Sequence, residues 1–189
     1  TPVTDRTLYA GIYGKGIYKS ADAGFSWAAS NSGLSNQDIF SLAIPVPAST
    51  TLYAGTDGGG VFKTTDSAAT WTTKNSGLLA SVITAITVDP NTTANIYVGT
   101  EQDGIFYSTD SADNWSVPTT NVTSLEVTDI VLDNTSTPAT DIYAATSGDR
   151  SDPLGGVYKS ADSGDVCARA TNHALSHYQV HALEILTGR

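Results

Sequence analysis

The sequence has few of the residues that would tie it to a disulfide scaffold, a nucleic acid or a membrane. It contains a single cysteine, which excludes an internal disulfide framework. Only nine of its 189 residues are Lys or Arg, against 19 acidic residues, and the net charge is −10. Nucleic-acid binding needs clustered basic side chains, so no nucleic-acid partner is expected. No apolar run approaches the length of about 18 residues that a membrane helix needs, and membrane insertion is not expected either.

Methionine is also absent, from which we expect a mature or excised segment. The length is sufficient to bury a core as a single domain over residues 1–189. A chain that is acidic, rich in Ser and Thr and nearly free of cysteine is typical of an outer compartment. We therefore expect an extracellular, cell-surface or periplasmic location.

Four copies of one unit cover nearly the whole chain. Each copy opens on a similar motif, written TLYAG, TLYAG, NIYVG and DIYAA in turn. The copies span approximately 7–50, 51–94, 95–140 and 141–189. The fourth copy carries an insertion at 147–155, SGDRSDPLG, that the others lack. Such self-similarity at a fixed period indicates a repeat architecture.

Within each copy, short runs rich in Tyr, Ile, Val and Thr alternate with clusters of Gly, Asp, Asn and Pro. Each copy supplies four such runs, and four strands in about 40–50 residues is the pattern of a propeller blade. We predict an all-β chain, a β-propeller made of four-stranded antiparallel blades with four repeats. It either closes as a four-blade ring, with the last strand at 181–186 completing the first blade, or forms part of a larger propeller. Open blade edges would otherwise invite association.

A turn with a fixed acid and a fixed aromatic follows the third strand of each copy. In the first copy it reads SADAGFSW. We expect Asp22 to accept hydrogen bonds from the turn backbone, Gly24 to adopt a left-handed conformation and Trp27 to pack between neighbouring sheets. Replacing Trp27 or Trp71 by Ala is then expected to cost about 3–5 kcal/mol. The residues assigned this structural role are Ser20, Asp22, Gly24, Trp27, Asp66, Trp71, Asp110, Trp115 and Asp162.

The pattern Ser/Thr-x-Asp-x-Gly-x-x-Trp resembles the Asp-box, or BNR repeat, of β-propellers. These include sialidases, xyloglucan-active glycosidases, sortilin-type receptors and a photosystem II assembly factor. The chain departs from the pattern where Ala68 and Ala112 replace the glycine and Cys167 replaces the aromatic. The resemblance implies the propeller fold, but no function follows from it, because one fold hosts many functions. The arginine cluster of sialidases has no equivalent here.

In the geometry that this resemblance implies, the loops between second and third strands share one rim. Five carboxylates fall on these loops: Asp57, Glu101, Asp103, Asp149 and Asp152. They could serve as the acid and base of a glycoside hydrolase, bind Ca²⁺, or simply occupy exposed turns. No catalytic residue can be assigned, and no cofactor other than Ca²⁺ is considered.

The three histidines all lie in the fourth copy, at His173, His177 and His181. Their spacing would suit zinc on a helix, but the repeat places His181 on a strand, so no zinc site is predicted. Cys167 stands where a core aromatic recurs and is expected to pack there rather than act as a nucleophile with His173. Glycosylation is left open at the four Asn-x-Ser/Thr sequons, Asn91, Asn114, Asn121 and Asn134.

The sequence favours a non-catalytic, extracytoplasmic propeller module that binds a protein or a glycan through its rim, or that serves as a scaffold. The alternative is a fragment of a carbohydrate-active glycoside hydrolase that uses the rim carboxylates. The insertion at 147–155 is either a contact site on the rim or a structural border of the repeat array.

Overall fold

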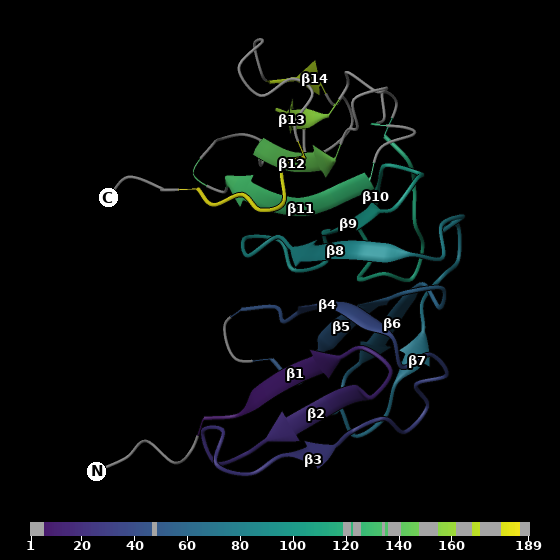
Figure 1. The fold of residues 1–189 in the computed structure, drawn as a ribbon, viewed down its shortest axis with the longest axis vertical. Helices are drawn as coiled ribbons and strands as arrows, with labels where there is room; N and C mark the ends of the chain where they lie inside the picture. The colour runs from purple at the N-terminus through teal and green to yellow at the C-terminus, as the bar shows by residue number, and fades with distance from the viewer. Residues whose placement is uncertain are drawn as a thin grey trace.

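The computed structural model describes residues 6–46, 49–118, 122, 126–133, 135, 141–147, 155–161, 168–170 and 179–185. Within these residues every regular element is a β-strand, and the strands form four antiparallel sheets (Figure 1). The prediction of an all-β propeller chain is confirmed. The described residues contain no helix long and apolar enough to span a membrane.

The sheets follow one another along the chain, and each is ordered from the concave to the outer side. The first sheet holds β1 (Leu8–Ile12), β2 (Gly16–Ser20) and β3 (Ala28–Ala29). The second holds β4 (Ile39–Ala43), β5 (Leu52–Thr56), β6 (Val61–Thr64) and β7 (Thr72–Thr73). The third holds β8 (Ile83–Val88), β9 (Ile96–Thr100) and β10 (Ile105–Ser108). The fourth holds β11 (Glu126–Asp133), β12 (Asp141–Ser147), β13 (Gly156–Ser160) and β14 (Ala168–Arg169).

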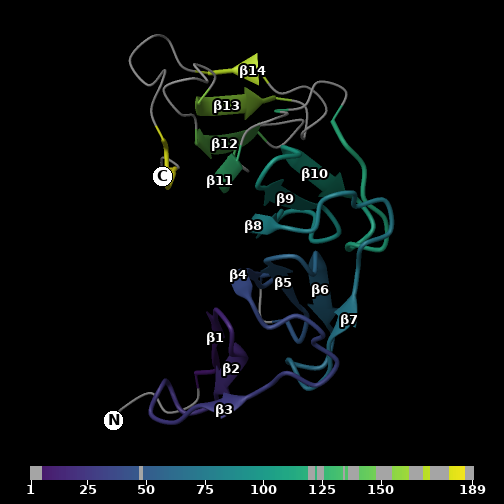
Figure 2. The same ribbon diagram turned by 45° about the vertical axis from the view of Figure 1, so that its right-hand side comes forward.

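The described chain forms an open arc, with the first sheet at one end and the fourth at the other (Figures 1 and 2). Residues 181–185, expected to complete the first sheet, lie against the fourth instead. The Val180 N–H donates to the Thr146 carbonyl at 3.3 Å, and the Leu183 N–H donates to Asp129 Oδ2 at 2.8 Å. The ring of four blades is therefore not closed by this segment in the structure.

In the first three copies, the strand that opens the copy carries a glycine where the next sheet approaches it. A Cβ on Gly55 would lie 2.6 Å from Ile83 Cγ2, and one on Gly99 would lie 2.6 Å from Val127 Cγ1. Both partner residues belong to the inner strand of the next sheet. The motifs that open the first three copies therefore end in glycine because the following inner strand leaves no room for a side chain, whereas the fourth motif, DIYAA, ends in alanine.

The acidic turn after each third strand is closed by hydrogen bonds to its own aspartate. Asp22 Oδ1 accepts from the Ser26 N–H at 2.9 Å and from Ser20 Oγ at 2.7 Å. Asp22 Oδ2 accepts from Ser26 Oγ at 2.5 Å. The bonds from Ser26 and Ser20 lower the pKa of Asp22 to about 2. The equivalent bonds hold the pKa values of Asp66 and Asp110 at about 2 as well.

The backbone of these turns is left-handed at two successive positions. Gly24 has φ +95°, as expected, and Ala68 and Ala112, which replace this glycine, both keep φ +69°. Alanine thus occupies a conformation that ordinarily favours glycine, and both alanine side chains are fully buried. The fourth turn, with Asp162 and Cys167, lies outside the described residues.

The tryptophans of the second and third turns lie between sheets. Trp71 and Trp115 are 3% and 5% exposed, and their indole N–H groups donate to carbonyls of the preceding copy, on Ser30 at 2.8 Å and on Lys74 at 2.7 Å. Trp27 differs, because it is 43% exposed and donates to Gly24 of its own turn at 3.1 Å. The expectation that Trp27 packs between two sheets is wrong in this structure, because the first sheet has no described neighbour on that side.

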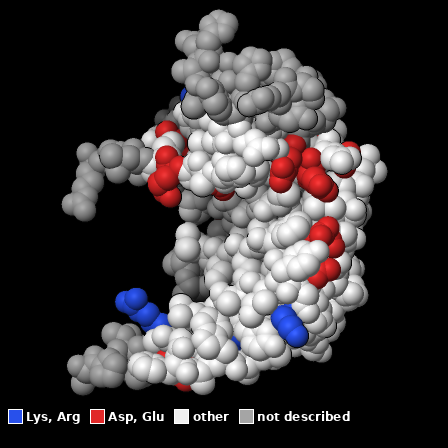
Figure 3. All heavy atoms as spheres, viewed as in Figure 1, with Lys and Arg blue, Asp and Glu red and all other residues white. Residues whose placement is uncertain are grey.

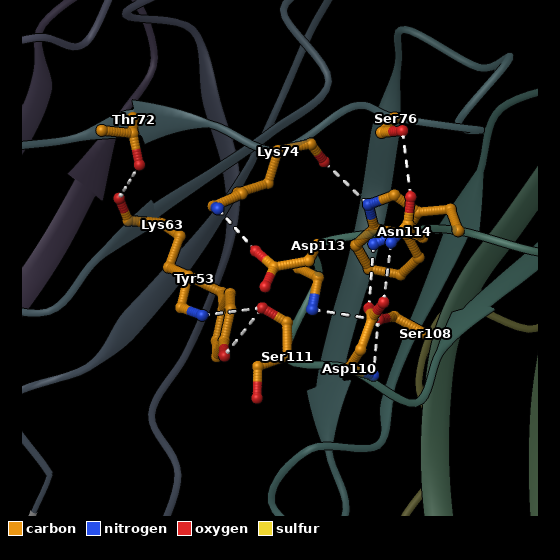
Figure 4. A network of polar contacts seen from close by, with 12 residues as sticks. Tyr53, Lys63, Thr72, Lys74, Ser76, Ser108, Asp110, Ser111, Asp113 and Asn114 are labelled. Carbon is orange, nitrogen blue, oxygen red and sulfur yellow. Dashed lines mark hydrogen bonds and ion pairs between the residues drawn. The ribbon is translucent and has the colours of Figure 1, made fainter.

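Further polar contacts join the second sheet to the acidic turn of the third (Figure 4). The Ser111 carbonyl accepts from Lys63 Nζ at 2.8 Å and from the Tyr53 hydroxyl at 3.5 Å. Lys74 forms an ion pair with Asp113 at 2.6 Å. The first two contacts recur one sheet earlier, where Lys19 and Tyr9 donate to Ser67. The acidic turns thus clamp successive sheets in one repeated geometry.

Candidate binding site at the rim and channel mouth

The turns between second and third strands are hydrogen-bonded to the segments that lead into the inner strands. The Gly16 N–H donates to the Gln37 carbonyl at 2.9 Å, which ties the first sheet to the second. The N–H groups of Gly58 and Gly60 donate to the Ser81 carbonyl at 3.1 and 2.8 Å, which ties the second sheet to the third. Gly58 and Gly60 have φ values of +93° and +73°, so these positions favour glycine. The rim is therefore continuous from one sheet to the next.

Two exposed aromatic rings stack on this rim. Tyr13, from the β1–β2 turn, and Phe40, from β4, lie with ring centroids 5.7 Å apart and an interplanar angle of 27°. They are 60% and 46% exposed. The Tyr13 hydroxyl donates to Asp57 Oδ2 at 3.0 Å. This bond, together with the negative charges of Asp57 and Asp38, raises the pKa of Tyr13.

Beside the aromatic pair, a cavity of about 270 Å³, here named the channel cavity, opens on the inner strands at the concave side of the arc (Figure 2). Glu126, at the start of β11, accepts a hydrogen bond on Oε2 from Ser147 Oγ at 2.8 Å. The repeat alignment explains the lining, because the residue after the first apolar residue of each inner strand faces this cavity. The described residues that line it are Phe40, Thr84, Glu126, Thr128 and His181.

The carboxylates predicted on the rim fall into separate places. Asp57 meets the aromatic pair, whereas Glu101 and Asp103 border a second pocket of about 140 Å³ together with Ser81, Val82 and Gln102. Figure 3 shows acidic side chains gathered along the right-hand edge of the molecule. Asp149 and Asp152, with the rest of the insertion from residue 148 to 154, lie outside the described residues.

A metal site is not formed by any described part of the chain, since no three His, Cys, Asp or Glu side chains there are grouped to hold an ion. His181 lies at the channel cavity. His173, His177 and Cys167 are outside the described residues. Of the sequons, Asn114 donates from Nδ2 to Asp110 at 2.8 Å and takes part in the acidic turn.

The aromatic pair and the cavity were not predicted from the sequence. The repeat pattern identifies residues that recur in every copy. Tyr13 and Phe40 do not recur, because the equivalent positions of the other copies are not aromatic. The usable signal was the inner-strand alignment, in which Phe40, Thr84, Thr128 and His181 occupy one position. Side chains at one strand position share a face, so these four were predictable as neighbours on the channel side.

The sequence matches no protein-family model and no curated protein. Among solved structures, the chain is similar to an ancestral GH74 enzyme, with a TM-score of 0.73 and 20% identity over 92% of this chain and 23% of that one. It is similar to the Niastella koreensis GH74 enzyme, with a TM-score of 0.68 and 20% identity over 87% of this chain and 28% of that one.

A third similar structure is YCF48 bound to D1 peptide, with a TM-score of 0.59 and 14% identity over 88% of this chain and 55% of that one. The chain thus spans between 23% and 55% of the length of these three proteins. At these identities the likeness concerns the fold alone: the chain shares the β-propeller fold with enzymes and with a peptide-bound protein.

Proposed function

We propose that the chain is a non-catalytic β-propeller module that binds a protein or a glycan at the rim and the channel cavity. The observation that carries this proposal is the exposed Tyr13–Phe40 stack beside an open cavity. Apolar surface left in water forgoes about 25 cal/mol per Å² of stabilisation, which a ligand that covers both rings would recover. Concave sites with aromatic walls and a few placed polar groups are typical ligand sites.

The comparisons support a binding role without selecting the ligand. One structural neighbour is YCF48 bound to a peptide, and another is a GH74 xyloglucanase from Xanthomonas campestris. An extracytoplasmic location is part of the proposal. It is supported by the composition and by a structural neighbour that is the extracellular domain of the hybrid two-component system BT4673 from B. thetaiotaomicron.

The test is ligand binding by the full chain on glycan and peptide arrays, followed by Tyr13→Ala and Phe40→Ala variants. We expect each variant to weaken binding of an array hit by about tenfold, since a buried aromatic contact is commonly worth more than 1 kcal/mol. Phe25→Ala is the matched control, because Phe25 is an exposed aromatic in an acidic turn away from the rim. A rim site would be contradicted if all three variants lost affinity for the ligand equally, or if none of them lost affinity.

The second candidate is a glycoside hydrolase fragment. It is favoured by the carboxylates of Asp57, Glu101 and Asp103 on adjacent turns of one rim, because glycoside hydrolysis commonly uses a pair of carboxyl groups. Hydrolysis of xyloglucan and other β-glucans is the assay. Turnover that disappears in Asp57→Asn or Glu101→Gln would establish the enzyme and overturn the non-catalytic proposal.

A further inference from the structure

The two threonines of the channel cavity can only accept hydrogen bonds from a ligand. Thr84 donates its hydroxyl proton to the Val127 carbonyl, and Thr128 donates its proton to the Val180 carbonyl. A carbonyl oxygen has no proton to give, so the direction of both bonds is fixed. Each hydroxyl has a single proton, and what remains on each oxygen is acceptor capacity.

Two further lining residues of the cavity, Glu126 and Phe40, attract positive charge. Glu126 brings a carboxylate, which accepts hydrogen bonds and carries a full negative charge. Phe40, which stacks on Tyr13, brings an aromatic ring, and the negative quadrupole at the face of such a ring attracts cations. None of the described residues that line the cavity is Lys or Arg. His181 is the one described lining residue that can donate, and it is exposed.

This lining distinguishes among ligand chemistries. A carboxylate or phosphate would meet hydrogen-bond acceptors and a negative charge, with His181 as the one side-chain donor among the described lining residues, so the lining disfavours it. A sugar hydroxyl both donates and accepts, so a glycan would leave many of its own acceptors unpaired and the Glu126 charge uncompensated. Ammonium and guanidinium groups carry only donors and a positive charge, so they match the threonine oxygens, the Glu126 carboxylate and the Phe40 ring.

We propose that this cavity binds the cationic side chain of a Lys or Arg presented by a protein partner. The proposal rests on the binding function proposed above, and it specifies that the ligand is a protein. The carboxylates on the surrounding rim, including Asp38 and Asp57, add long-range attraction for such a partner, and the net charge of −10 acts in the same sense. Lys15 is the described basic residue on the rim turn that carries Tyr13, and it does not line the cavity.

The test uses blocked tripeptides with one charge at most, so that general attraction to an acidic protein stays small. Acetyl-Gly-Arg-Gly-amide is compared with the neutral Gln peptide and the acidic Glu peptide, and a xyloglucan oligosaccharide is the glycan probe. Binding is followed by NMR titration of the full chain. We expect the Arg peptide to bind at least about tenfold more tightly than the Gln peptide.

Two variants locate the site. Phe40→Ala and Glu126→Gln should each weaken the binding of the Arg peptide by about tenfold. Asp113→Asn is the matched control, because it removes one exposed carboxylate from an acidic turn, where Asp113 pairs with Lys74, and should change binding by less than about twofold. Melting curves confirm that each variant folds.

Three results would overturn this inference. The Gln peptide could bind as tightly as the Arg peptide, or binding of the Arg peptide could be equal in all variants, which would mean unspecific attraction. The oligosaccharide could bind in a Phe40-dependent way while the Arg peptide does not, and then the rim site stands as a glycan site. Absence of binding by every probe at millimolar concentration would overturn this inference, whereas the proposed function is overturned only if the glycan and peptide arrays also give no hit that depends on Tyr13 or Phe40.

Discussion

The indole N–H of Trp71 donates to the backbone carbonyl of Ser30, 41 residues earlier in the chain, at 2.8 Å. The same ring is 3% exposed and belongs to the core cluster that also holds Ile17 and Leu34. One side chain therefore supplies both apolar burial and a satisfied hydrogen bond between two sheets. Such a contact is costly to remove, because truncation leaves a cavity and an unpaired carbonyl.

Trp71→Ala should lower the free energy of unfolding by about 3–5 kcal/mol, the usual range for removal of a buried large aromatic. Trp27→Ala should cost about 1 kcal/mol or less, because partly exposed side chains contribute far less. Urea denaturation of the two variants measures the difference. Similar midpoints for both would mean that the two rings are equally buried in solution, contrary to the structure.

Acid should destabilise the fold between about pH 4 and pH 2 through the acidic turns. The pKa values of Asp22, Asp66 and Asp110 are about 2 in the folded chain, below the unfolded value near 3.9. As the pH falls, the unfolded chain takes up these protons first, so the stabilisation present above pH 4 is lost toward pH 2. Melting temperature against pH is the measurement.

Replacing all three aspartates by Asn should flatten this part of the profile, because the titrating groups are gone. Asp103→Asn, on the rim, serves as the control for the removal of a carboxylate. A triple variant whose melting temperature falls as steeply as that of the parent would show that other groups control acid stability.

Gly55→Ala should destabilise the contact between the second and third sheets by about 1–3 kcal/mol, the range for overpacking. The new Cβ would lie 2.4 Å from Ser41 Oγ and 2.6 Å from Ile83 Cγ2. Gly58→Ala is the comparison, since its nearest atom is Asn36 Nδ2 at 3.8 Å and its cost of about 1 kcal/mol arises from the positive φ alone. A Gly55→Ala variant that unfolds at the parent midpoint would contradict the close approach.

Asp57→Asn should bring the pKa of Tyr13 down toward its ordinary value. The hydrogen bond to the Asp57 carboxylate is the largest cause of the raised pKa, and the charge of Asp57 is the next. NMR titration of ¹³C-labelled tyrosine resolves this group from the other eight tyrosines. Glu101→Gln removes a rim charge outside this contact and should leave the titration unchanged.

The repeat architecture was predictable because it is encoded locally and four times over. Tyrosine, glycine and aspartate recur at fixed offsets, and each offset has a direct steric or hydrogen-bonding cause, as Gly55 and Asp22 illustrate. Trp27 could not be placed correctly in this way. Its burial depends on the sheet beside it, which is a property of position in the array and not of the motif.

The candidate site could be predicted from the sequence only in part, for a related reason. Carboxylates in Gly-rich turns, such as Asp57 and Glu101, were placed on the rim from the geometry that the Asp-box resemblance implies. The stack of Tyr13 on Phe40 joins a turn of one copy to the inner strand of the next, and each aromatic occurs once. Pairwise contacts between non-recurring residues leave no periodic trace, so only coordinates bring them together.

The backward reach of each acidic turn gives the array a direction. Because Trp71 bonds to the first copy and Trp115 to the second, the interfaces between the first and second sheets and between the second and third each depend on a contact from the later copy to the earlier one. Stability of such an array is a sum of sheet and nearest-neighbour terms. A lesion in one turn should therefore free amide protons for exchange at a single interface, on the side of the earlier copy, while interfaces further along remain protected. Unfolding of this molecule would then begin at the sheet interface whose turn has been weakened, and it would proceed from one interface to the next.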